Sequence, residues 1–117
     1  MDIPKDLVAA SATPLVLAVL RQGDSYGYEI IRRIRDLSGG ELSWSEGMLY
    51  PLLHRLADQR LIEGYQATSP AGRPRTFYRL LPSGSARFKK HREWFALVSA
   101  TLAALDEMRK EGAHATS

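Results

Sequence analysis

The sequence contains no cysteine among its 117 residues. A disulfide framework and a thiolate metal site are therefore excluded, and this absence suits a reducing compartment. The sequence also lacks an apolar run long enough to span a bilayer, and residues 1–6 show no secretory character. We therefore expect a soluble, cytoplasmic protein with no membrane partner.

Catalytic and metal-binding motifs are missing as well. The three histidines, His54, His91 and His114, have no metal-ligand spacing with Asp or Glu. There is no nucleophile elbow, no acidic pair and no phosphate-cradling loop, since Gly39 and Gly40 follow a helical segment and end it. The sequence therefore predicts that the protein is not an enzyme and that it binds no cofactor and no metal ion.

The charge is nearly balanced, with 16 Lys and Arg against 13 Asp and Glu and a net charge of +3. The total charge therefore does not point to nucleic acid, but the positions of the arginines do. One helix, the next helix and a later turn carry arginines that are expected to line a single concave basic surface. These are Arg32, Arg33, Arg35, Arg55, Arg73 and Arg75.

The length and the 44% hydrophobic content allow one domain with a modest core. The predicted order is three helices, two strands and a fourth helix. Pro14 is expected to kink or divide the first helix, because proline lacks the amide proton and clashes with the preceding turn. The expected helices cover about 5–21, 26–37, 46–59 and 83–109, and the strands 65–68 and 76–80.

The third helix has one apolar face and one face suited to a DNA groove. Ser45 is a good N-cap, and Trp44 stands where it can pack against Leu49 in the first turns. The apolar face is Leu49, Leu52, Leu53 and Leu56. The opposite face, with hydrogen-bonding, aromatic and cationic groups, is Gly47, Tyr50, Pro51, His54 and Arg55.

Two β-prone runs flank residues 69–75, where proline and glycine forbid regular structure. This pattern predicts a hairpin from whose tip Arg73 and Arg75 project. A guanidinium there can pair with a phosphate or enter the minor groove. The alternative is a solubilising charged turn, but its place directly behind the third helix favours a wing. Tyr26, at the start of the second helix, is expected to contact phosphate.

The last helix carries two apolar stripes. A helix that projects from a small domain cannot bury both stripes against its own core. One is therefore expected to pack on the first helix and the other on a twin subunit, giving a twofold homodimer. The alternative is a helix folded back on a monomer core. The first stripe is Phe88, His91, Phe95, Val98, Leu102 and Leu105, and the second is Trp94, Leu97, Thr101, Ala104 and Met108.

Four sequence features together resemble the PadR family of transcriptional regulators, in its short form with a single C-terminal helix. They are residues 23–30 (GDSYGYEI), 49–56 (LYPLLHRL), 72–80 (GRPRTFYRL) with Gly84 after them, and Trp94 in the last helix. The resemblance covers nearly the whole chain. The sequence departs from the family pattern at Met48, where Thr is usual, and at Leu81, where a capping Thr is usual. Ser83 is expected to take over the cap.

The resemblance implies a mainly α fold with a β-hairpin, a winged helix-turn-helix with a long C-terminal dimerisation helix. In short members, an aromatic residue faces its symmetry mate across a pore and stacks on flat ligands, a role open here to Trp94 or Phe95. The expected DNA contacts are Tyr26, Arg32, Ser45, Gly47, Met48, Tyr50, Pro51, His54, Arg55, Arg73 and Arg75. The implied pocket residues, for which core packing is the alternative, are Leu7, Ala10, Pro14, Ala18, Phe88, His91, Trp94, Phe95 and Val98.

The expected function is that of a ligand-responsive repressor that binds a pseudo-palindromic operator on double-stranded DNA as a homodimer. Residues 1–82 would form the DNA-binding domain, 83–110 the dimerisation helix and 111–117 a frayed, flexible tail. The expected effector is a planar aromatic molecule of the multidrug type. Ser99 stands where an acidic residue could favour cationic ligands, so the sequence does not support a preference for cations. The alternative function is a dimeric module that binds aromatic ligands or a partner protein and has incidental DNA affinity.

Overall fold

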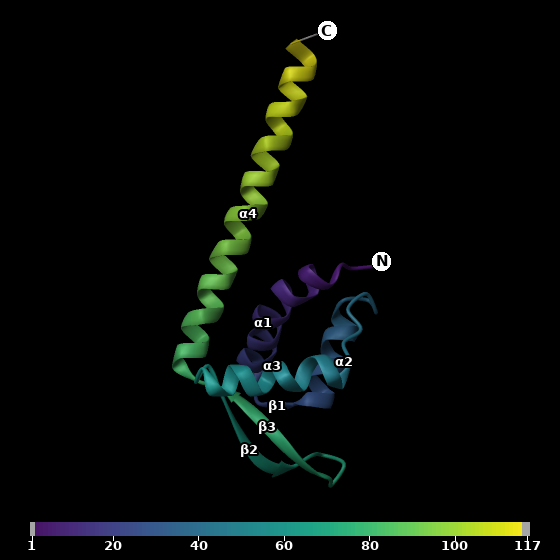
Figure 1. The fold of residues 1–117 in the computed structure, drawn as a ribbon, viewed down its shortest axis with the longest axis vertical. Helices are drawn as coiled ribbons and strands as arrows, with labels where there is room; N and C mark the ends of the chain where they lie inside the picture. The colour runs from purple at the N-terminus through teal and green to yellow at the C-terminus, as the bar shows by residue number, and fades with distance from the viewer. Residues whose placement is uncertain (1, 116–117) are drawn as a thin grey trace.

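The computed structural model describes residues 2–115 as four helices and a three-stranded sheet. The elements are α1 (Lys5–Gln22), β1 (Ser25–Tyr26), α2 (Gly27–Leu37), α3 (Glu46–Asp58), β2 (Ile62–Thr68), β3 (Pro74–Leu80) and α4 (Pro82–Ala115). Helices α1, α2 and α3 gather into a head, the β2–β3 hairpin extends from one side, and α4 projects from the other (Figure 1). The principal axes measure 67 × 30 × 21 Å. The predicted mainly helical fold with a hairpin and a long last helix is confirmed.

The core lies where α1, α2 and α3 meet. Trp44, which precedes α3, belongs to this core, and Ser45 caps α3 by accepting a hydrogen bond from the Met48 N–H at 3.1 Å. The N-cap and the apolar face predicted for α3 are therefore both confirmed. The fully buried side chains at this junction include Val16, Leu17, Ile30, Leu49, Leu53 and Leu56.

The sheet has the order β1-β3-β2, with both pairings antiparallel. The sequence prediction missed β1, which pairs Ser25 with Tyr78 and Tyr26 with Phe77. A two-residue strand has no alternation of its own to detect, and its pairing depends on β3, about fifty positions further along the chain. Strand β3 also begins at Pro74, earlier than predicted.

Helix α1 is bent and not divided, so of the two outcomes expected at Pro14 the kink is the one observed (Figure 1). The helix runs as one element from Lys5 to Gln22 with Pro14 inside it, and it bends in its N-terminal half (Figure 1). The amide that proline lacks would have bonded the carbonyl of Ala10, and Ala10 is exposed to water. A carbonyl that water can satisfy lowers the cost of an internal proline, so the helix continues.

Helix α4 is attached to the head through a tight contact. A Cβ on Gly84 would lie 2.0 Å from the carbonyl oxygen of Leu61, so only glycine fits there. The hydroxyl of Ser83 donates to the carbonyl of Arg60 rather than capping α4 as expected. No helix in the described chain combines the length and apolarity that crossing a bilayer requires.

Helix α4 extends further toward the C-terminus than the sequence predicts. The helix continues through Ala115, past the boundary expected after residue 110. Thr116 and Ser117 lie outside the described residues. At about 1.5 Å per residue, its 34 residues extend about 51 Å. Most of that length has no neighbouring element from its own chain to pack against (Figure 1).

Candidate nucleic-acid interface and α4 groove

The outer face of α3 presents the residues that sequence patterning predicted. Pro51, His54 and Arg55 are exposed, as is Gly47 near the helix start. Met48 is half-buried against the core, so it is only partly available to a ligand. This face can therefore offer an imidazole, a guanidinium and a stretch of open backbone to a groove.

Tyr50 is held in place by α2 rather than standing free. A Cβ on Gly27 would lie 2.7 Å from the Tyr50 hydroxyl oxygen, so the phenol ring lies directly on the first residue of α2. Tyr78 is close by: burial raises the pKa of its phenol, and the charge of Tyr50 raises it further. Glycine at position 27 thus allows α2 and α3 to approach closely enough to fix the ring.

Arg75 does not project from the hairpin tip as predicted. It lies in β3 and is half-buried, with its guanidinium carbon 5.7 Å from the centroid of the Tyr26 ring. Its Nε is buried and has no hydrogen-bond partner within residues 2–115. Alternate strand residues share a face, so Arg75 lies beside Phe77, and Tyr26 pairs with Phe77 from β1. Arg73, in the turn, is exposed as expected.

Tyr26, Tyr50, His54 and Arg75 meet around one hollow of about 270 Å³ between α3 and the hairpin, here called the wing hollow. Four of the predicted DNA contacts are therefore brought together. The sequence analysis missed the other five lining residues. Two of them are joined across the strands, where the amide nitrogen of Gln66 donates to Thr76 Oγ1 at 2.7 Å. The complete lining is Tyr26, Gly27, Tyr50, His54, Gln66, Pro74, Arg75, Thr76 and Tyr78.

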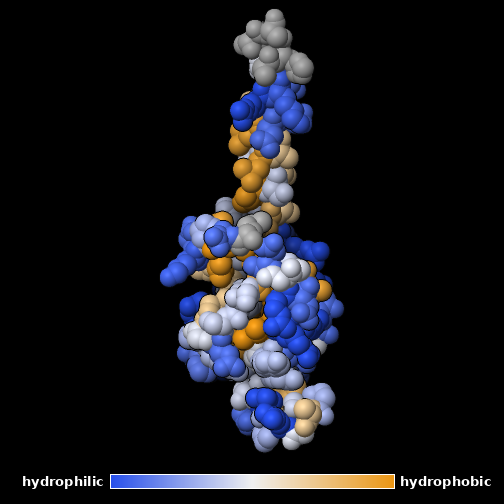
Figure 2. All heavy atoms as spheres, turned by 90° about the vertical axis from the view of Figure 1, so that its right-hand side faces the viewer, coloured by the Kyte–Doolittle hydropathy of each residue, from blue (hydrophilic) through white to orange (hydrophobic). Residues whose placement is uncertain are grey.

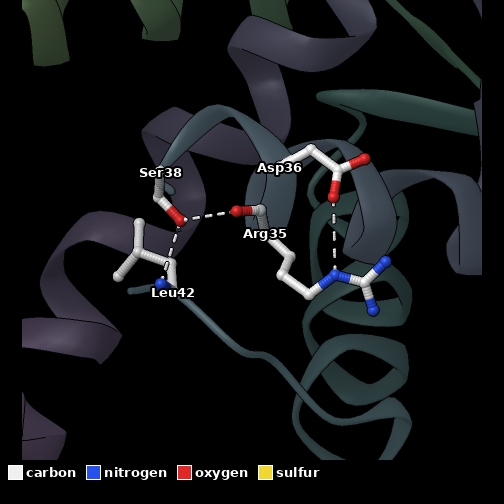
Figure 3. Close-up of polar contacts among 4 residues, drawn as sticks. All are labelled: Arg35, Asp36, Ser38 and Leu42. Atoms are coloured by element: carbon white, nitrogen blue, oxygen red, sulfur yellow. Dashed lines mark hydrogen bonds and ion pairs between the residues drawn. The ribbon is translucent and has the colours of Figure 1, made fainter. Parts of the chain in front are cut away.

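The arginines of α2 do not form the single basic surface that was expected. Arg32 is exposed, whereas Arg33 turns toward α1 and lines a different hollow. Arg35 pairs with Asp36, their Nε and Oδ1 atoms 3.5 Å apart (Figure 3). Successive helical residues differ by about 100° in direction, so three neighbouring arginines cannot share one face.

The predicted glycine stop of α2 is confirmed. Gly39 and Gly40 have φ angles of 64° and 84°, in the left-handed region that favours glycine. The hydroxyl of Ser38 donates to the Arg35 carbonyl at 3.1 Å and accepts from the Leu42 N–H at 2.9 Å (Figure 3). This turn fixes the approach of the chain to α3.

Both predicted stripes of α4 are present, and beyond the first turns they are uncovered. Every side chain from Arg92 to Gly112 is exposed, with Trp94 at 61% and Leu102 at 59%. Apolar side chains line the part of α4 that projects beyond the head (Figure 2). A helix folded back on its own core is therefore the wrong alternative. The exposed large apolar residues of α4 are Trp94, Phe95, Leu97, Val98, Leu102, Leu105 and Met108.

An apolar groove of about 330 Å³ lies where α4 passes α1 and is here called the α1–α4 groove. Pro14, Ala18, Phe88 and Phe95 line it, as the ligand-site prediction implies. Leu15, Ser11 and Arg92, which the sequence analysis missed, complete the lining. Phe95 rather than Trp94 therefore faces the groove within one chain.

The other predicted pocket residues lie outside this groove. Leu7 and Ala10 are exposed on α1, and Val98 is exposed one turn beyond Phe95. His91 is half-buried; burial lowers the pKa of its imidazole, and the positive charge of Arg87 lowers it further. The side chain of His114 lies outside the described part of the chain. Within that part, no cluster of three His, Cys, Asp or Glu side chains could hold a metal ion.

Comparison with known proteins identifies the family. The model of the transcriptional regulator PadR-like family matches residues 16–90, from α1 to the first turns of α4. The chain belongs to the PadR-like family. The fold and the family are those of DNA-binding transcriptional regulators, which are not enzymes.

Two solved transcriptional regulators match most of the chain, and a curated relative matches a shorter segment. A solved transcriptional regulator from Clostridium thermocellum is 30% identical, with a TM-score of 0.76 over 84% of this chain and 95% of that one. A solved PadR-like regulator from Bacillus cereus strain ATCC 14579 is 27% identical, with a TM-score of 0.76 over 86% and 96%. The transcriptional regulator YqjI of Escherichia coli (strain K12) is 42% identical over 48 residues, which are 41% of this chain and 23% of that protein.

Proposed function

We propose that this PadR-family chain is a homodimeric repressor that binds a pseudo-palindromic operator in the cytoplasm and responds to a small molecule at its dimer interface. The observation that carries the proposal is that the two ends of the molecule have different surfaces. One end presents the open face of α3 beside the wing hollow, and the other presents an uncovered apolar helix. The first end suits DNA, and the second suits a twin subunit.

In this proposal α3 enters the major groove. Ser45, Gly47 and Met48 lie at its start, and Tyr50, Pro51, His54 and Arg55 follow on the face toward the bases. Phosphate contacts come from Tyr26, Arg32, Arg73 and Arg75. The buried, unpartnered Nε of Arg75 supports this role, because a buried cationic donor gains most from an anionic acceptor.

Dimerisation through α4 follows from the cost of leaving its stripes in water. Burying one Leu, Phe, Met or Val side chain is worth about 1.5–3 kcal/mol. Six side chains of these types, together with Trp94, are exposed along α4 in each copy, whereas a monomer normally exposes such residues singly. Residues 1–82 then act as the DNA-binding domain and α4 as the dimerisation helix. Twofold symmetry places the half-sites about one helical turn of DNA apart.

The ligand response is assigned to the α1–α4 groove. Phe95 offers an aromatic face beside Pro14 and Ala18, and the partner subunit would close the open side. A flat ligand of the multidrug type that separates or stiffens the two α4 helices would change the distance between the two α3 helices of the dimer. Its free energy of binding would then depend on whether operator DNA is bound.

The test is a binding and sedimentation experiment on the full chain. An operator is selected from a random duplex library, and its affinity is compared with that of a scrambled duplex at about 150 mM salt. We expect a dimer at micromolar concentration and an affinity ratio of at least about 10³. A monomer would contradict the assembly. Equal affinity for both duplexes would favour the alternative function, a ligand- or protein-binding module with incidental DNA affinity.

A further inference from the structure

A second hollow lies at the base of α4, beside the α1–α4 groove. Its volume is about 350 Å³, and it is here called the cationic hollow. Phe88 and Arg92 line both spaces, so the hollow and the groove adjoin along α4. The lining of the hollow is Arg21, Pro82, Ser85, Ala86, Phe88, Lys89 and Arg92.

The charge of this hollow is of one sign. Arg21, Lys89 and Arg92 contribute three cations, and its lining holds no carboxylate. Within residues 2–115 none of these three side chains forms an ion pair. The Arg21 guanidinium carbon lies 5.3 Å from the centroid of the Phe88 ring, which holds one charge at the border with the groove. Three uncompensated cations around one space create a positive potential that an anion would neutralise.

The adjoining groove has the opposite character. Ser11, Pro14, Leu15, Ala18, Phe88 and Phe95 surround it, and Arg92 is its one charged lining residue. A ligand that fills both spaces must therefore be apolar at one end and negatively charged at the other. A cationic ligand would meet three like charges in the hollow, which disfavours it.

We propose that the cationic hollow and the α1–α4 groove together bind an apolar organic monoanion. Its carboxylate or sulfonate lies among Arg21, Lys89 and Arg92, and its hydrophobic body lies against Phe88, Phe95 and Pro14. The guanidinium of Arg92, which lines both spaces, contacts the head group where the body ends. This assignment rests on the proposed ligand response and gives its chemical class.

The first arm of the test compares two probes with the same ring and opposite charge. Binding of 1-naphthoate and of 1-naphthylmethylammonium to the full chain is measured by calorimetry at neutral pH. Because the apolar contribution is matched, the ratio of affinities reports the charge preference of the site. We expect 1-naphthoate to bind at least about tenfold more tightly. Equal affinities, or tighter binding of the cation, would overturn the proposal.

The second arm compares two double variants that remove the same charge from the same helix. Lys89→Gln with Arg92→Gln changes the hollow, whereas Arg87→Gln with Lys90→Gln changes neighbouring exposed residues outside its lining. The first pair should lower 1-naphthoate affinity at least about tenfold and should not weaken binding of the cationic probe, because it removes charges that repel a cation. The control pair should change it less than about twofold, since exposed charges are screened. Equal losses in both pairs would mean a diffuse positive field and no site.

The third arm separates failure of this site from failure of the proposed repressor function. Operator affinity is measured with and without saturating 1-naphthoate. Selective binding of 1-naphthoate that leaves operator affinity unchanged would support the anion site and refute the ligand response. If the Lys89 and Arg92 substitutions lower operator affinity and its salt dependence but not 1-naphthoate binding, these cations contact DNA phosphates and the anion site is refuted.

Discussion

Arg75 provides a sharp test of the proposed DNA interface, because the structure gives it a geometry that a flexible surface arginine lacks. Its guanidinium carbon lies 5.7 Å from the Tyr26 ring centroid, and its Nε is buried without a partner. A single phosphate contact contributes about 0.9 to the slope of log K against log salt concentration. A dimer holds two copies, so Arg75→Ala should reduce that slope by about 1.8.

This slope has a measurable consequence. Between about 50 and about 200 mM salt, wild-type operator affinity should fall about tenfold more than the affinity of Arg75→Ala. Arg75→Lys keeps the charge and therefore the slope, but it loses the planar contact with Tyr26. That contact exists in the protein without DNA, so its loss should lower the free energy of unfolding by about 0.5–1 kcal/mol per copy, while the salt slope of operator binding stays that of wild type.

Arg79 supplies a matched control on the same strand. It also lies over a tyrosine ring, 4.4 Å from the centroid of Tyr65, but it is exposed and its Nε lies 3.9 Å from a Glu63 carboxylate oxygen. Arg79→Ala should leave operator affinity and salt slope unchanged. The measurement is fluorescence anisotropy of a labelled operator over a salt series. An Arg75→Ala slope equal to that of wild type would refute the phosphate contact. If Arg79→Ala reduced the salt slope as much as Arg75→Ala does, the effect would reflect overall charge and not a contact specific to Arg75.

Three further predictions concern assembly and stability. Leu102→Glu should yield monomers in sedimentation, because it places an unpaired carboxylate in the proposed dimer interface. Ala103→Glu, which lies outside both stripes, should remain dimeric. If both variants are dimeric, the interface lies elsewhere. Gly84→Ala should lower the melting temperature by roughly 4 °C or more, since its Cβ would lie 2.0 Å from the Leu61 carbonyl oxygen; an unchanged melting temperature would contradict that contact. Burial lowers the folded-state pKa of His91 below the ordinary 6.5, so its contribution to stability is complete above pH 6.5 and is lost as the pH falls below that value. In thermal melts, His91→Gln should remove this part of the acid sensitivity. A pH profile identical to that of wild type would contradict the contribution of His91.

The parts of the fold that sequence patterning predicted correctly depend on local information. The apolar face of α3 and its Ser45 cap are set within a few residues, because helical spacing and capping are local properties. The glycine stop of α2 is equally local. The exposed face of α3 follows from the buried one by geometry alone, which is why Gly47, Pro51, His54 and Arg55 are predictable, whereas the packing of Tyr50 on Gly27 is not.

The features that sequence patterning got wrong, left open or missed depend on contacts between distant segments. The position of Arg75 follows from the pairing of β1 with β3, which brings Tyr26 beside it, and no local pattern announces a two-residue strand. The choice between Trp94 and Phe95 depends on a rotation of about 100° of α4, which one residue of register decides. The charge of the cationic hollow was also hidden, because Arg21 and Lys89 come from helices far apart in the sequence.

The proposed ligand site and the proposed DNA surface are linked by very little chain. Arg21, in the cationic hollow, is five positions before Tyr26, in the wing hollow. Two hydrogen bonds hold the segment between Arg21 and Tyr26 in place. The hydroxyl of Ser25, which is fully buried, donates to Glu29 Oε1 at 2.6 Å, and Tyr65 donates to Asp24 Oδ2 at 2.6 Å. A ligand that shifts α1 against α4 would therefore move Tyr26 and the start of α2, on which the ring of Tyr50 lies. Because linkage is reciprocal, operator DNA bound at Tyr26 and Tyr50 must change ligand affinity by the same factor as the ligand changes operator affinity.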